Sequence, residues 1–233
     1  MENEFDPKNK KVLIITAHAD DADFSCGGTL IKWIDQGAKA AIVIATNGDK
    51  GTHDQNVTGE ALVQLRKKEQ LEASEFLGLE NTWFLDYPDA HLENTQELKE
   101  KLVKIIREYQ PDAVFTWDPT LVYTVEKNFI NHPDHRAIGQ AVLDCVYPMA
   151  RDFLTFPNNS SHKVEHLFLF NFEKANYSVD ISDAASKKLE LLKKHTSQFS
   201  DGMKEEMEDF DHSAGEKMGV ASAESFVHLT IAP

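Results

Sequence analysis

Two short groups of histidine and aspartate side chains have the residue types that a metal-dependent hydrolase needs. The first group, His18, Asp20 and Asp21, directly follows the apolar run at residues 12–15. The second group is His132-Pro-Asp-His135, at the start of a helical pattern. Zinc prefers nitrogen and oxygen ligands, and a catalytic zinc site uses three protein ligands plus water. The two groups together therefore predict a catalytic metal site.

The elements that must position these groups alternate along the chain. Apolar runs typical of strands lie at 12–16, 41–46, 113–117 and 166–171, with weaker ones near 82–86 and 226–231. Helical patterns lie between them at 24–36, 60–77, 95–109, 134–147 and 184–199. This alternation predicts an α/β fold with a Rossmann-like, mostly parallel sheet and helices on both faces. The length of 233 residues suits a single domain over 1–233.

The strand order along the chain predicts that the two groups meet. In open parallel sheets, ligands bind at the carboxyl ends of the strands. His18 follows the first strand, Asn47 follows the second, and Asp118 follows the strand at 113–117. These side chains and the group at 132–135 can therefore converge at one edge of the sheet.

Neighbouring side chains in each group cannot all do the same work. On a strand-to-helix turn the side chains of Asp20 and Asp21 diverge, so one can bind metal while the other faces water. His132 and His135 are three residues apart and share a helix face, so one can bind metal and the other approach the substrate. Asp134 can orient one imidazole, and it is available as the orienting partner of His132. Alone, an Asp-Asp pair also fits a helix N-cap, and a lone His-x-x-His also fits a surface pair.

Composition narrows the class of partner. The net charge is −15, from 24 basic and 39 acidic side chains, which argues against nucleic acid because that binding depends on Lys and Arg. No run approaches the ~20 apolar residues of a membrane helix. A small-molecule substrate is the expected partner, and a homo-oligomer is compatible with the sequence.

The N-terminal residues and the cysteines indicate the cellular compartment. The first residues are acidic and polar, unlike a signal peptide, so we expect a cytoplasmic protein with a flexible tail over 1–10. Cys26 and Cys145 fall in apolar helical patterns, and we expect both to be reduced and buried.

The two motifs resemble those of a known family. Ala17-His-Ala-Asp-Asp-Ala-Asp23 and His132-Pro-Asp-His135-Arg136 are similar to the paired motifs of the PIG-L/LmbE-like zinc-dependent N-deacetylases. That family carries Ala-His-Pro-Asp-Asp-x-Glu and His-x-Asp-His, and its members remove acetyl from N-acetylglucosaminyl groups. Residues 46–51, 65–69 and 111–115 and the C-terminal part also resemble it, although less specifically.

The resemblance implies a role for each matching residue. The zinc ligands would be His18, Asp21 and His135, with another divalent metal such as Fe²⁺ as an alternative. Asp20 would be the general base, and His132 would polarise or protonate the substrate.

The resemblance also implies supporting residues. Asp134 would orient a histidine and Arg66 would be a cation on the substrate side, where we also place Asn47 and Asp118. Taken together, these roles imply hydrolytic N-deacetylation of an amino-sugar substrate.

Three positions depart from the family pattern. Ala19 replaces the usual proline, and Asp23 replaces glutamate, which shortens a side chain at the helix start by one methylene. Ile130 stands where some members carry a tyrosine, so tyrosine assistance to the oxyanion is absent from that position.

Two other interpretations remain. A hydrolase of another ester or phosphoester bond would need a further ligand cluster if it used two metals, and Asp118 is the one obvious spare. A non-enzymatic sugar- or nucleotide-binding module predicts a Gly-rich first turn, but that turn is His-Ala-Asp-Asp. The acidic stretch at 200–219 could be a mobile helix-loop near the site, and we favour a solvated surface instead. Trp117 could stack on a sugar or simply pack.

Overall fold

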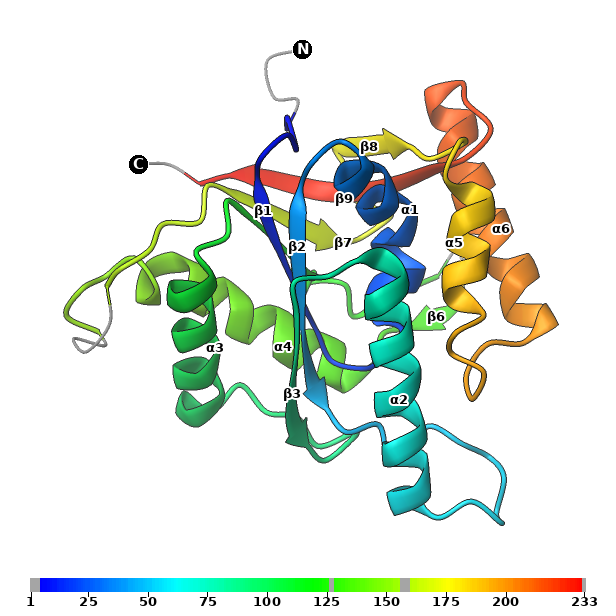
Figure 1. Cartoon of the computed structure of the whole chain (residues 1–233), viewed down its shortest axis with the longest axis horizontal. Coiled ribbons are helices and arrows are strands. Elements are labelled where there is room, and N and C mark those ends of the chain that lie inside the picture. The colour runs from blue at the N-terminus through cyan, green and yellow to red at the C-terminus, as the bar shows by residue number, and fades with distance from the viewer. Residues whose placement is uncertain (1–4, 126–127, 156–159, 232–233) are drawn as a thin grey trace.

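The protein is built around one seven-stranded sheet (Figure 1). The computed structural model describes residues 5–125, 128–155 and 160–231. The strand order is β3-β2-β1-β4-β7-β9-β8. The strands are β1 (Lys11–Thr16), β2 (Lys39–Thr46), β3 (Asn81–Tyr87), β4 (Ala113–Trp117), β7 (His166–Phe170), β8 (Tyr177–Asp180) and β9 (Ala223–Thr230). Strands β1, β2, β3, β4 and β7 pair in parallel, and β9 is antiparallel to both neighbours. The predicted mostly parallel sheet is confirmed.

Helices cover both faces of this sheet, as predicted (Figure 1). One face carries α1 (Asp21–Asp35), α2 (Gly59–Leu77) and α5 (Ala185–Leu192). The other carries α3 (Gln96–Tyr109) and α4 (Pro133–Asp144), which a π-turn extends over Cys145–Met149. A separate hairpin pairs β5 (Tyr123–Thr124) with β6 (Phe129–Ile130). None of the helices within the described ranges is long and apolar enough to cross a membrane.

The first strand shows why the sequence folds this way. Val12 and Ile14 pack toward α1, α2 and α5, whereas Leu13 and Ile15 pack toward α3 and α4. All four side chains are fully buried. Burying each contributes about 1.5–3 kcal/mol, so a strand with a continuous apolar run is stable only at the centre of a covered sheet.

The centre of the sheet is also where the chain changes direction. Strand β1 lies between β2 and β4, so the connections on its two sides run to opposite halves of the sheet. Such a switch point opens a crevice at the carboxyl ends of the strands. Helix α4 approaches this point closely, because a Cβ on Gly139 would collide with the carbonyl oxygen of Trp117 at the end of β4.

The structure corrects two expectations about the chain. Residues 1–4, the start of the flexible tail predicted for 1–10, lie outside the described ranges. Phe5 is 5% exposed, and its ring centroid lies 4.7 Å from that of Trp33. The prediction of a flexible tail is therefore wrong from Phe5 onward. The stretch expected to be a solvated surface at 200–219 is mostly α6 (Asp201–Met218), which packs against β8 and β9. Strand β8 was not predicted. Cys26 and Cys145 are free and buried, as predicted.

Candidate metal centre

The turn after β1 separates the two adjacent aspartates. Asp20 is the N-cap of α1 and has φ 96°, in the left-handed region that non-glycine residues avoid. Strain of this kind costs about 1–3 kcal/mol and is concentrated at functional sites. The turn sends Asp21 into a buried position, whereas Asp20 stays partly exposed. The predicted divergence of these side chains is present.

Three side chains from two distant segments form a compact donor set. His18 Nδ1 lies 3.1 Å from His135 Nε2, and His135 Nε2 lies 3.1 Å from Asp21 Oδ1. His18 Nδ1 is 3.6 Å from Asp21 Oδ2. Ligands about 2.1 Å from a tetrahedral zinc ion are roughly 3.4 Å apart, so the spacing of these atoms fits a single ion. Two nitrogens and one carboxylate oxygen are a donor set that zinc accepts.

Asp21 is held so that one oxygen remains available. Its Oδ2 accepts hydrogen bonds from the backbone N–H of His18 at 2.9 Å and from Trp117 Nε1 at 3.1 Å. A third donor is the backbone N–H of Ala17 at 3.2 Å. Oδ1 faces His135. The carboxylate is therefore oriented before any ion binds.

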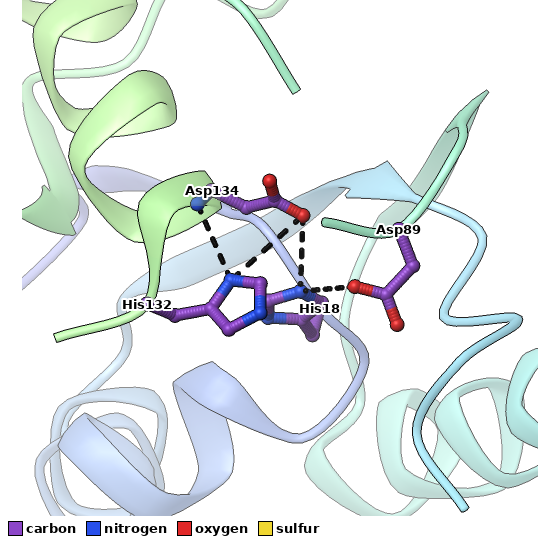
Figure 2. Close-up of side chains that lie close together, drawn as sticks. All are labelled: His18, Asp89, His132 and Asp134. Atoms are coloured by element: carbon purple, nitrogen blue, oxygen red, sulfur yellow. Dashed lines mark hydrogen bonds and ion pairs between the residues drawn. The ribbon is translucent and has the colours of Figure 1, made fainter. Parts of the chain in front are cut away.

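The opposite edge of the His18 ring is held by two carboxylates (Figure 2). His18 Nε2 lies 3.1 Å from Asp89 Oδ1 and 3.4 Å from Asp134 Oδ2. Asp134 is fully buried and also accepts hydrogen bonds from the backbone N–H groups of Ala90 and Leu92, at 2.7 and 3.1 Å. A carboxylate at Nε2 fixes the tautomer that leaves Nδ1 free for a metal.

His135 is oriented in the same manner by a neutral partner. Its Nδ1 donates to the side-chain oxygen of Asn131 at 2.8 Å, which leaves Nε2 free. Its ring stacks on Trp117 with centroids 3.9 Å apart and planes within 6°. Trp117 therefore packs in the site and supports two of the three donors, which answers the question that the sequence left open.

The electrostatics of the cluster favour a cation. Burial acts to lower the pKa of His18, but Asp21, Asp134 and Asp89 outweigh burial and raise that pKa to about 12. Burial also acts to raise the pKa of Asp21, yet the His135 and His18 imidazoles hold it well below its usual range. A cluster that retains a buried proton against desolvation can exchange that proton for a divalent ion.

His132 adopts a different arrangement from the one predicted. Asp134 Oδ2 is 3.9 Å from His132 Nδ1, too far for a hydrogen bond, so the carboxylate orients His18 rather than His132. The Nδ1 of His132 instead accepts from the backbone N–H of Asp134 at 3.2 Å and caps α4 (Figure 2). Burial and the neighbouring His18 lower its pKa. Both effects favour the neutral ring, and the Asp134 N–H at Nδ1 leaves the ring proton on Nε2.

Of the three residues predicted on the substrate side, one lines the site. Arg66 is 5% exposed and donates to the Ala19 carbonyl oxygen at 2.8 Å and to Asp20 Oδ1 at 3.3 Å. Asn47 Oδ1 accepts from the backbone N–H of Asp49 within its own turn.

Asp118 is likewise occupied by neighbouring side chains and backbone, from its own loop and from the end of β7. This buried carboxylate accepts from Asn171 Nδ2 at 2.6 Å and from the hydroxyl and backbone N–H of Thr120. Its oxygens are occupied by these donors, so the geometry gives it a structural role in place of the predicted contact with substrate.

The departure at Asp23 has a partner that the sequence did not reveal. Asp23 Oδ2 lies 2.6 Å from His195 Nε2, and both side chains are almost fully buried. His195 follows α5 and is distant in sequence from the first motif. The shorter carboxylate therefore still makes a contact at the start of α1.

Asp89 is one of the site residues that sequence reasoning missed, as is Asn131. Asp89 follows β3 at the same carboxyl edge as His18 and Asn47. The rule that places ligands at strand ends applied to it equally, but the sequence around it, including His91, does not repeat the spacing of the two His/Asp groups.

Two cavities meet at the donor set and share Asp20, Asp21 and His135. The first has a volume of about 400 Å³, lies against α6 and is mostly apolar. The second, about 460 Å³, is polar, and it is lined in addition by His18, Lys50, Gly51, Arg66, Asp89, Ala90, His132 and Gln198. Neither cavity includes Asn47 or Asp118 among its lining residues.

Known proteins share this sequence and architecture. The family model described as GlcNAc-PI de-N-acetylase, PIG-L, matches residues 13–146. A diacetylchitobiose deacetylase of Thermococcus kodakarensis is 34% identical over 210 residues, covering 86% of this chain and 74% of the relative. A probable N-acetyl-alpha-D-glucosaminyl L-malate deacetylase 2 of Bacillus anthracis is 26% identical over 230 residues, covering 94% and 95%.

A solved structure of a deacetylase has the same fold as this chain. The N,N'-diacetylchitobiose deacetylase of Pyrococcus horikoshii, in complex with an inhibitor, superposes with a TM-score of 0.87 at 32% identity. The match covers 95% of this chain and 84% of that one. The family resemblance inferred from the two motifs is thereby confirmed, and the chain belongs to the PIG-L family of de-N-acetylases.

Proposed function

We propose that this protein hydrolyses the amide bond of an N-acetylglucosaminyl-type substrate, with zinc held by His18, Asp21 and His135. The observation that carries the proposal is the convergence of three oriented donors with a partly exposed carboxylate, Asp20, at the junction of two cavities. The relatives named as deacetylases of N-acetylated sugars support the substrate class.

A bound divalent ion would lower the pKa of a water molecule and polarise the amide carbonyl. Asp20 acts as the general base and accepts the proton of the attacking water. Burial raises the pKa of Asp20, with Arg66 opposing the rise, which brings this base closer to the working pH. Asp20 then returns the proton to the leaving amine, because His132 holds its proton on a neutral ring.

His132 stabilises the negative charge that develops on the carbonyl oxygen. The backbone N–H of Asp134 occupies Nδ1, so Nε2–H is the group left to donate toward the cavity. A fixed neutral donor of this kind stabilises an oxyanion without a change in its own protonation.

The polar cavity accommodates the sugar. Arg66, Lys50 and Gln198 supply donors and Asp89 supplies acceptor oxygens around it. Sugar hydroxyls both donate and accept hydrogen bonds, so a wall of mixed polarity matches them.

The function is tested by incubating the zinc-loaded protein with a panel of N-acetylglucosaminyl conjugates and measuring released acetate. Acetate release that requires the metal and stops on chelation is the expected result. Binding of these compounds by titration calorimetry without acetate release would show a sugar-binding module instead.

We expect His132→Asn to separate the catalytic role of His132 from its capping role. Asparagine is a good N-cap, so α4 keeps its first hydrogen bond and thermal unfolding stays near the wild-type temperature. The donor toward the substrate oxygen is lost, and turnover falls by about 10²–10³-fold.

His132→Ala is the matched variant, because it also removes the cap and costs about 1 kcal/mol of stability. Zinc content by mass spectrometry stays at the wild-type level in both variants. Loss of zinc from the folded asparagine variant would make His132 a ligand and refute its role as the oxyanion donor.

A further inference from the structure

We propose that the apolar cavity against α6 binds the acyl part of the substrate, and that the enzyme therefore hydrolyses amino sugars with N-acyl chains longer than acetyl. This inference rests on the proposed function, because it concerns the same amide bond.

The character of the apolar cavity differs from that of the polar one. Its wall carries Phe24, Phe129, Phe172, Met203, Met207 and Phe210. Met203, Met207 and Phe210 come from α6, which brings a stripe of apolar side chains to the cavity, and Phe210 packs on Phe172 with ring centroids 5.3 Å apart. An apolar wall of this kind gains free energy when a hydrocarbon group replaces water in the cavity.

The geometry of an amide assigns the two cavities. The carbonyl carbon must lie at the shared residues, since the donor set and the base are there. The substituent on nitrogen is a sugar with several hydroxyl groups, which fits the polar cavity. The substituent on the carbonyl carbon then extends into the other cavity, whose wall is apolar.

The size of the cavity exceeds what acetyl needs. A methyl group occupies roughly the volume of one water molecule, about 30 Å³. The cavity measures about 400 Å³. A chain of several methylenes therefore fits where the acetyl methyl would fill a small part.

The charged groups of this cavity do not call for a cationic ligand. Asp211 receives the Lys188 ammonium at 2.8 and 2.9 Å, and Lys188 is fully buried. Glu224 also pairs with Lys188 at 2.8 Å and accepts the backbone N–H groups of Gly28 and Thr29. Both carboxylates are satisfied within the protein, and Glu206, which also lines the cavity, is exposed to solvent. The aromatic and methionine side chains are therefore left to select the ligand.

The test compares zinc-loaded wild-type protein on N-acetyl-, N-butanoyl- and N-octanoyl-glucosamine, with the released amine quantified. A fourth substrate, the octyl glycoside of N-acetylglucosamine, places the same alkyl chain on the sugar side. We expect kcat/KM to rise about fourfold for each of the first added methylenes of the acyl chain. Relative to N-acetylglucosamine, the rise in kcat/KM should be far smaller for the octyl glycoside than for N-octanoyl-glucosamine.

Each other outcome has a distinct meaning. A fall in kcat/KM with acyl length, with N-acetylglucosamine still hydrolysed, overturns the acyl site and leaves the proposed function standing. A gain confined to the octyl glycoside assigns the cavity to the aglycone and also overturns it. No hydrolysis of any of the four substrates overturns the proposed function itself.

A filled-cavity variant gives an independent test. Ala214 lines the cavity on α6, so Ala214→Phe should reduce activity on N-octanoyl-glucosamine at least tenfold more than it reduces activity on N-acetylglucosamine. Asp209→Phe is the matched control, because it adds the same ring to an exposed position of the same helix. Equal losses on both substrates in Ala214→Phe, or the same chain-length effect in Asp209→Phe, would contradict the proposal.

Discussion

Replacing His135 with alanine is expected to leave a folded protein that retains far less than one equivalent of zinc after dialysis. His135 Nε2 lies 3.1 Å from both other donors, so its loss removes one of three ligands and opens the donor set on one side. Removing a group that merely orients a ligand weakens metal binding by about 10–100-fold, and removing the ligand should exceed that loss. Zinc is measured by mass spectrometry, and circular dichroism checks the fold.

The control for this variant is His212→Ala, which removes a histidine from an exposed position on α6. It should retain full zinc and full turnover. Asn131→Ala tests orientation separately, because Asn131 accepts the Nδ1–H of His135, and its loss should weaken zinc binding by about 10–100-fold. A full equivalent of tightly bound zinc in His135→Ala would show that the donor set is assigned wrongly.

The donors themselves could be predicted from sequence because each lies at a boundary with a local signature. His18 and Asp21 follow a strand buried on both faces, and His135 follows a proline at the start of a helix. Strand ends and helix starts are encoded by short patterns of apolar residues, proline and capping residues. The parallel sheet then brings such ends together without further information.

The partners of those donors could not be predicted in the same way. Asp134 was expected to orient His132, its neighbour in sequence, but helix geometry turns its carboxylate toward His18, which is distant in the sequence. Asp89 reaches His18 from the end of β3. Such pairings depend on the packing of whole elements, which local patterns do not specify.

Helix α6 was missed because its polar residues hide its apolar stripe. Met203, Met207, Phe210 and Ala214 recur every three or four residues, which is the spacing of one helix face. Seven acidic residues lie among and around them over Asp201–Met218, so the stretch resembles a solvated surface. The role of these apolar side chains becomes visible only in the structure, where they line the cavity.

The largest loss of turnover without loss of metal is expected for Asp20→Asn. Asparagine is nearly isosteric with aspartate and tolerates the left-handed backbone that Asp20 adopts at φ 96°. Its side-chain oxygen can still accept from Arg66, which lies 3.3 Å from Asp20 Oδ1. It cannot accept a proton from water, so turnover should fall by about 10²–10⁴-fold, the usual contribution of a general base.

Asp86→Asn is a matched control for this substitution. Asp86 also has a positive φ, 59°, and pairs with a basic side chain, Lys67 Nζ at 2.6 Å, but it lies outside both cavities at the metal centre. The same chemical change there should leave turnover within twofold of wild type. Steady-state acetate release and zinc content are measured for both variants. If Asp20→Asn retains zinc and works within a few-fold of wild type, the base is another residue, and the separation of Asp20 from Asp21 by the strained turn serves the fold rather than the reaction.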